Sequence, residues 1–213
     1  DLWSASSSSN TAYTGMSGTS MSSPNVAGSL GLLIQHYRTT HSGEDMRAAT
    51  LKAVVIHSAD ECGSNTGPDY TFGWGLANTQ KGAAVITADQ SEPGVIQELA
   101  VANDTSFAQD WTYSGTGPIK ATIVWTDPPG TPPVPALDPL YKALVNDLDL
   151  RIDGPGPTSY FPWKLNRASP SSAATTGVND VDNVEMVAIA APAAGTYTVV
   201  VTHKGVLVNN LQR

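Results

Sequence analysis

The spacing of apolar residues changes once along this chain of 213 residues. Up to about residue 88, apolar side chains recur at helical spacing in three stretches. They predict one helix over about 23–37, a second from a cap at 42–45 to about residue 57, and a third over 79–86 behind a cap at Asn78. A shift in composition over 88–94 then indicates a linker.

After the linker, apolar and polar residues alternate, the pattern of half-buried strands. Five segments show it, at about 107–113, 119–125, 148–152, 184–188 and 197–201. Several short strands separated by Pro and Gly turns predict an all-β sandwich, jelly-roll-like in architecture. We therefore expect two domains, residues 1–88 and residues 89–213.

The composition restricts the partners of the protein. Charged residues make up 14% of the chain, and 11 Lys and Arg against 19 Asp and Glu give a net charge of −8. This acidic balance argues against nucleic acid or an anionic membrane surface as a partner. There is no apolar run near the ~18 residues of a membrane span. Cys62 is the single cysteine, so no disulfide forms within the chain.

The stretch from Gly18 to Gly28 reads GTSMSSPNVAG and leads into the first predicted helix. It predicts a tight turn that places Ser20 at the start of a thin, buried helix. Pro24 fits the first turn of that helix, where a missing N–H costs nothing. Unpaired N–H groups and the helix dipole favour negative charge at such an end. A serine held there can attack a carbonyl while its own N–H stabilises the oxyanion.

These eleven positions resemble the nucleophile segment of the subtilisin-like serine proteases, whose usual form is GTSMA-[TS]-PHVAG. The resemblance implies that Ser20 is the catalytic nucleophile and that its backbone N–H serves the oxyanion hole. Ser22 and Asn25 replace the usual Ala and His, and neither is a triad position. A lipase-type G-x-S-x-G elbow is not met, because Ser22 takes the place of its last glycine. The plain alternative is a serine that caps a core helix.

The partners that activate a subtilase serine lie upstream of it in the family, in the order Asp, His, Ser. Here 19 residues precede Ser20, and they contain no His and only Asp1 as an acid. None of the four histidines stands in a family-like His-Gly-Thr setting: His36, His41, His57 and His203. The resemblance also places the oxyanion-hole Asn and the substrate-binding strands upstream. We therefore expect the chain alone to be inactive and to need the upstream part of the same protease.

The β half carries a second resemblance, to the C-terminal β-barrel of a subgroup of bacterial alkaline subtilases, itself similar to the P domain of kexin and furin. The similar segments are Val124–Asp127, Ala143–Leu150, Asp182–Glu185 and Pro192–Val199. Related domains bind calcium, which takes six to eight oxygen ligands. The resemblance implies calcium as a cofactor here, with six candidate ligands: Asp127, Asp147, Asp149, Asp180, Asp182 and Glu185. The alternative is that these are solvated residues of strands and turns.

Together these observations predict the C-terminal portion of a secreted serine endopeptidase. Its fold would be an α/β remnant of a subtilase catalytic domain over residues 1–88, followed by the all-β sandwich. Its substrate would be a protein or peptide, cleaved through an acyl-enzyme on Ser20. Two rivals stay open: a non-catalytic β-sandwich binding module attached to a protease remnant, and an intact small hydrolase that uses one of its own histidines.

Overall fold

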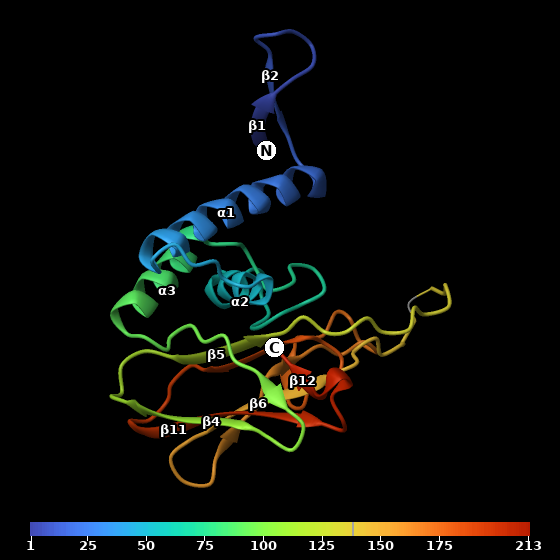
Figure 1. Ribbon diagram of the computed structural model, residues 1–213. Coiled ribbons are helices and arrows are strands. Elements are labelled where there is room, and N and C mark those ends of the chain that lie inside the picture. Colours follow the sequence, from blue (N-terminus) through green and yellow to red (C-terminus); the bar gives the residue numbers. More distant parts are fainter. Residues whose placement is uncertain (138) are drawn as a thin grey trace.

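The computed structural model describes residues 1–137 and 139–213 of the protein. Three layers stack on one another (Figure 1): a group of helices, a two-stranded sheet and a four-stranded sheet. The helices are α1 (Thr19–Thr40), α2 (Ala48–Ser58) and α3 (Thr79–Ser91). A hairpin of β1 (Leu2–Ala5) and β2 (Tyr13–Met16) projects beyond the first turn of α1. No helix in the described ranges is long and apolar enough to cross a membrane.

Helix α1 begins earlier than the sequence predicts, at Thr19 rather than near residue 23. Gly18 precedes it with a φ of 145°, a backbone conformation that glycine adopts without strain. Pro24 therefore lies inside the helix and not in its first turn, so its position was predicted wrongly. Proline has no N–H to donate to the carbonyl of Ser20, and that helical bond is missing from the second turn.

The prediction of a cap at residues 42–45 for the second helix is also wrong, because α2 begins only at Ala48. Ser42 has a φ of 56°, outside the helical region, and Asp45 pairs with Arg38 of α1 instead. The cap of α3 is confirmed: the Asn78 side chain accepts the backbone N–H of Lys81, 2.9 Å away. That helix runs on to Ser91, so the first part of the predicted linker is helical.

All five predicted strands form: β4 (Phe107–Tyr113), β5 (Ile119–Val124), β6 (Asp147–Asp153), β10 (Val184–Ile189) and β11 (Gly195–Lys204). Five two-residue strands complete the β region: β3 (Val101–Ala102), β7 (Ser159–Tyr160), β8 (Trp163–Lys164), β9 (Thr175–Thr176) and β12 (Leu211–Gln212). The larger sheet has the order β4-β11-β6-β7, and β10 pairs with β5 separately. All pairs are antiparallel, and the described strands form open sheets rather than a closed barrel. A jelly-roll topology and the domain boundary at 88/89 stay predictions.

The alternation of the strands places one face of each sheet in a common core. Its fully buried members include Ile119 and Val187 of the small sheet and Leu150, Ile152 and Tyr197 of the large one. The helices enclose a smaller core of Leu33, Tyr37, Val54 and Ile86. The β region therefore holds the larger of the two cores.

Helix α2 lies on the outer face of β5 and joins the two regions. The His57 ring nitrogen Nδ1 lies 3.0 Å from the hydroxyl of Thr122, and Lys120 Nζ donates to the carbonyl of His57 at 2.9 Å. A cation at the C-terminal end of a helix is favourable because it meets unpaired carbonyls and the negative end of the dipole. The helical region and the β region are thus in direct polar contact.

Candidate active site

Ser20 occupies the second position of α1, immediately after the turn at Gly18. The Gly18 carbonyl accepts the backbone N–H groups of Met21 and Ser22 at 3.0 and 3.1 Å. The first N–H groups of a helix have no acceptor within the helix, so the N–H of Ser20 is free to bind an oxyanion. The side chain is exposed. The turn and the helix start predicted for Ser20 are therefore present.

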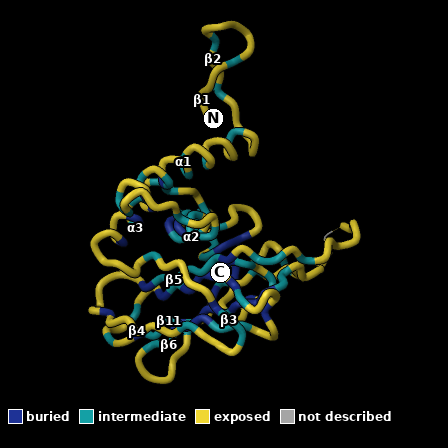
Figure 2. Tube along the Cα trace, in the orientation of Figure 1, coloured by how far each residue is buried: buried dark blue, intermediate teal, exposed yellow. Residues whose placement is uncertain are grey.

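The surroundings of Ser20 differ from the buried helix that the sequence predicts. Only Leu33 and Tyr37 of α1 are buried, and both lie in its second half. Figure 2 shows the first half of the helix and the hairpin as mostly exposed. The prediction of a buried helix was wrong for the first turns of α1, which are mostly exposed; further along, Val26 and Ser29 border a small cavity between the three helices.

The hairpin beside Ser20 presents apolar side chains to solvent. Trp3 and Tyr13 stack with ring centroids 6.5 Å apart, and Trp3 remains 73% exposed. Leu2 and Met16 are also exposed, on the same two strands. By the register of the hairpin, Leu2 and Met16 lie on one face and Trp3 and Tyr13 on the other, and exposed large apolar side chains of this kind are typical of interaction surfaces. This surface lies at the end of the molecule that carries the candidate nucleophile.

No histidine of α1 can serve Ser20 as a base. His36 lies 16 residues along the helix, roughly 24 Å away at 1.5 Å per residue. Its Nε2 lies 2.8 Å from the hydroxyl of Thr87 on α3. His41 follows the last turn of the same helix and lies farther still. Neither His36 nor His41 is therefore placed to take the proton of Ser20.

His41 forms an Asp–His pair that has no serine beside it. Its Nε2 lies 3.0 Å from Oδ2 of Asp89, and its ring stacks on Tyr37 with centroids 3.8 Å apart. The other Asp89 oxygen accepts the backbone N–H groups of Gly94 and Ile96. All these groups lie at the α1–α3 contact, so the pair fastens helices together rather than activating a nucleophile.

The remaining two histidines belong to the sheets. Burial, and then the charge of Lys120, lowers the pKa of His57 to about 4, so its ring is neutral near pH 7. It is held against Thr122 of β5. His203 of β11 bonds the carbonyl of Gly205 at 2.9 Å. Within the described residues, therefore, Ser20 has no histidine base.

Two of the candidate calcium ligands organise loops. Both oxygens of Asp127 accept backbone N–H groups, from Val145 at 2.7 Å and Asn146 at 2.8 Å. These bonds tie together the two ends of the segment between residues 127 and 145. Asp182 accepts a bond from the side chain of Asn179 at 3.0 Å. Donors of the protein therefore already occupy part of the acceptor capacity of both carboxylates.

Three other candidates are paired with lysines. Lys142 Nζ lies 2.9 Å from Oδ2 of Asp147 and 3.8 Å from Oδ2 of Asp180. Lys204 Nζ lies 3.5 Å from Oδ1 of Asp147 and 2.7 Å from Oδ1 of Asp149. Two ammonium groups thus stand where a calcium ion would supply the positive charge.

Glu185 of β10 is fully buried where that strand meets β6. Its Oε2 accepts the backbone N–H of Leu150, and Oε1 has no hydrogen-bond partner in the described residues. Burial raises the pKa of Glu185 to about 8; Asp149 and Asp147 add to the rise, whereas the Leu150 N–H and Lys204 oppose it. The carboxyl is therefore mostly protonated near pH 7.

As placed, the six carboxylates do not fit a single calcium site. No group of three or more His, Cys, Asp or Glu residues in the described ranges is arranged to hold a metal. Calcium binding stays a prediction of the resemblance, and this geometry adds no support to it.

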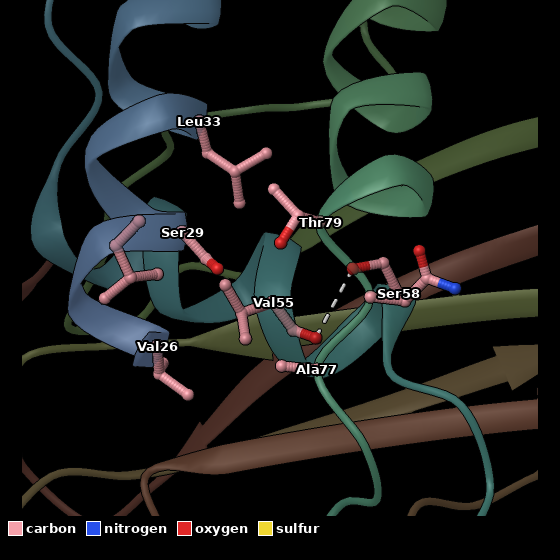
Figure 3. Close-up of a pocket in the computed structure, with 9 residues that line it drawn as sticks. Val26, Ser29, Leu33, Val55, Ser58, Ala77 and Thr79 are labelled. Carbon is pink, nitrogen blue, oxygen red and sulfur yellow. Dashed lines mark hydrogen bonds between the residues drawn. The ribbon is translucent and has the colours of Figure 1, made fainter. Parts of the chain in front are cut away.

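Two cavities lie away from Ser20. The smaller, between the three helices, has room for about one water at ≈ 10 Å³ (Figure 3). Ser29 and Ser58 are polar members of its wall, and it is too small for a substrate. The larger, of ≈ 220 Å³, lies between α2 and the β region and includes Trp74, Lys120 and Trp163 in its wall. Sequence analysis missed it, because those residues are far apart in the chain and no spacing connects them.

The part of the chain that contains Ser20 matches a known protein family. Residues 2–75 match the model of the subtilase family. No curated protein matches the chain. The matched segment covers the hairpin, α1 with Ser20, α2 and the turn that holds Trp74, and it ends before the β region. The match supports a relationship of this part of the chain to the subtilase serine proteases.

Proposed function

We propose that this chain is the C-terminal portion of a secreted, subtilisin-type serine endopeptidase with Ser20 as its nucleophile. One observation carries the proposal: in the segment that matches the subtilase family, Ser20 is exposed at the second position of α1. The serine Oγ would attack the carbonyl carbon of a peptide bond, and the negative charge on the oxygen would meet the free N–H of Ser20. The result is an acyl-enzyme that water then hydrolyses.

The reaction needs a base that takes the proton from Ser20 and returns it to the leaving amine. The described histidines are held elsewhere, at α3, Asp89, β5 and Gly205. We infer that the upstream part of the same protease supplies the His and Asp of the triad and docks on the exposed apolar hairpin. Association there would bury Trp3 and Tyr13, which face solvent in this structure.

We assign residues 89–213 to a P-domain-like β domain of the alkaline protease subgroup. Its open antiparallel sheets and single large core support an all-β unit. Its contact with α2, through Thr122 and Lys120, would stabilise the segment that carries the nucleophile.

A test uses a longer form of the protease that includes the upstream residues, with an unfolded protein as substrate. Ser20→Ala should lower kcat/KM by at least ~10³, because removal of the nucleophile leaves only the other parts of the site. Ser23→Ala is the matched control, an exposed serine one helical turn further on, and should retain activity. Full activity in Ser20→Ala would overturn the proposal and favour the non-catalytic binding module.

A further inference from the structure

The larger cavity lies where the helical region meets the β region. Ile56 of α2 and Met186 and Ala188 of β10 contribute its apolar surface, and the indoles of Trp74 and Trp163 contribute aromatic surface. Its volume of ≈ 220 Å³ is below the 300–1,000 Å³ typical of drug-sized ligands. A single amino-acid residue is the scale of ligand that fits.

The backbone at Gly67 lies close to Trp163 in the wall of this cavity. Gly67, with a φ of 81°, brings its loop so near Trp163 that an added Cβ would lie 2.8 Å from the indole. The loop backbone therefore packs directly on the Trp163 ring, with no side chain between ring and loop.

Four charged residues line the cavity, and two of them form an ion pair with each other. Lys81 pairs with Asp60, and the two Glu61 oxygens accept the backbone N–H groups of Cys62 and Gly67. Lys120, in contrast, donates to the neutral carbonyl of His57. No carboxylate in the described parts of the chain lies within ion-pairing distance of it.

The ammonium of Lys120 is half-buried and carries three donors, of which one is used by His57. Burial lowers the pKa of Lys120, the charge of Lys81 lowers it further, and Glu61 opposes the change. A half-buried cation without a counter-ion is costly, and an anion beside it recovers part of that cost. The cavity thus offers a half-buried ammonium beside aromatic and apolar walls, whereas the Glu61 carboxylate of the same wall already accepts two backbone N–H groups.

We propose that this cavity binds a monocarboxylate with an apolar body of about one residue, the chemistry of the C-terminal residue of a peptide. The carboxylate pairs with Lys120, and the apolar body lies among Trp74, Trp163 and Met186. The site shares no residue with the Ser20 region, so binding does not depend on the proposed protease activity.

Calorimetric titration of the 213-residue chain with N-acetyl-leucine tests this site, with N-acetyl-leucinamide as the uncharged probe. The acid should bind, and the amide should bind at least about tenfold more weakly because it cannot form the ion pair. Lys120→Met, which keeps the alkyl chain, should weaken binding of the acid by a similar factor. Lys52→Met is the control, since Lys52 is an exposed lysine of α2 outside the cavity wall.

A second variant tests the cavity itself with the charge left in place. Ala188→Leu adds three carbons to the cavity wall and should also weaken binding of N-acetyl-leucine, with Lys120 unchanged. Thermal melts of each variant separate loss of the site from loss of the fold. The inference is wrong if the acid does not bind to the wild-type chain, if acid and amide bind equally, or if both folded variants bind as the wild type does.

Discussion

The β region and the Ser20 end of the molecule both carry large apolar side chains but differ in how far these are buried (Figure 2). Leu150 of β6 is 1% exposed, whereas Trp3 of the hairpin is 73% exposed; Leu32, on the exposed side of α1 further along the helix, is 61% exposed. Every long strand of the β region faces another strand or helix of the same chain. Among the described residues, no element beyond its own two strands and the start of α1 packs extensively on the hairpin.

This difference in burial shows which apolar side chains are covered by other parts of the described chain and which are exposed. Apolar surface that meets its counterpart stabilises the fold by about 25 cal/mol per Å² buried. Leu2, Trp3, Tyr13 and Met16 are exposed and lack much of that contribution, and they lie on the hairpin proposed above as a docking surface. The contrast in burial supports the proposal that a further part of the protease packs on the hairpin.

The largest expected effect contrasts two leucines. Leu150→Ala should lower the free energy of unfolding by about 3 kcal/mol, because it leaves a cavity in the closed core. Leu32→Ala should change it by less than about 0.5 kcal/mol, since little apolar area is lost from an exposed position. Urea denaturation measures both. Equal losses in the two variants would contradict the contrast between the regions.

A smaller effect concerns pH and the β core. The folded pKa of Glu185, about 8, lies above its ordinary value of 4.5, so the folded state holds the proton more tightly than the unfolded state does. This contribution to stability is complete below pH 4.5 and is lost as the pH rises to about 8. Glu185→Gln keeps an acceptor for Leu150 and cannot ionise, so it should remove the loss and be the more stable protein at pH 8.

Melting curves between pH 4.5 and pH 8.5 measure the Glu185 effect. Glu44→Gln, at an exposed glutamate, is the matched control and should follow the wild-type profile. A wild-type profile that Glu185→Gln leaves unchanged would show that this carboxyl does not titrate between the two pH values.

The smallest expected effect lies in the helical region. Asp89→Asn should lower the free energy of unfolding by about 1 kcal/mol, because it weakens the bond to His41 and two bonds to backbone N–H groups. Asp45→Asn, at an exposed pair with Arg38, should have a smaller effect because solvent screens that pair. Denaturant titration compares the two, and the reverse order would argue against a fastening role for Asp89.

Much of the fold follows from local patterns in the sequence. Alternation places the five long strands, and the Asn78 cap places the start of α3. The early start of α1 could not be predicted, because Pro24 favours a first turn there and the conformation of Gly18 decides otherwise. The start of α2 was missed because Asp45 pairs with Arg38 across a turn rather than capping the next helix.

For the site, the sequence predicts Ser20 as the nucleophile, and that role stays a prediction; the structure adds that Ser20 is exposed at the start of α1. Sequence reasoning could not place the candidate calcium ligands, since their lysine partners come from other strands and loops. Lys204 meets Asp149 only because β11 pairs with β6. The cavity at Lys120 likewise depends on long-range packing of α2 on β5.

Labelling with a fluorophosphonate probe tests the central claim most directly, because the probe reacts only with a serine that has a functioning base. The account predicts no Ser20-dependent labelling of the 213-residue chain alone, and labelling in the longer form that Ser20→Ala abolishes and Ser23→Ala retains. Strong labelling of the chain alone that disappears in Ser20→Ala would contradict it, since the base would then lie within these residues.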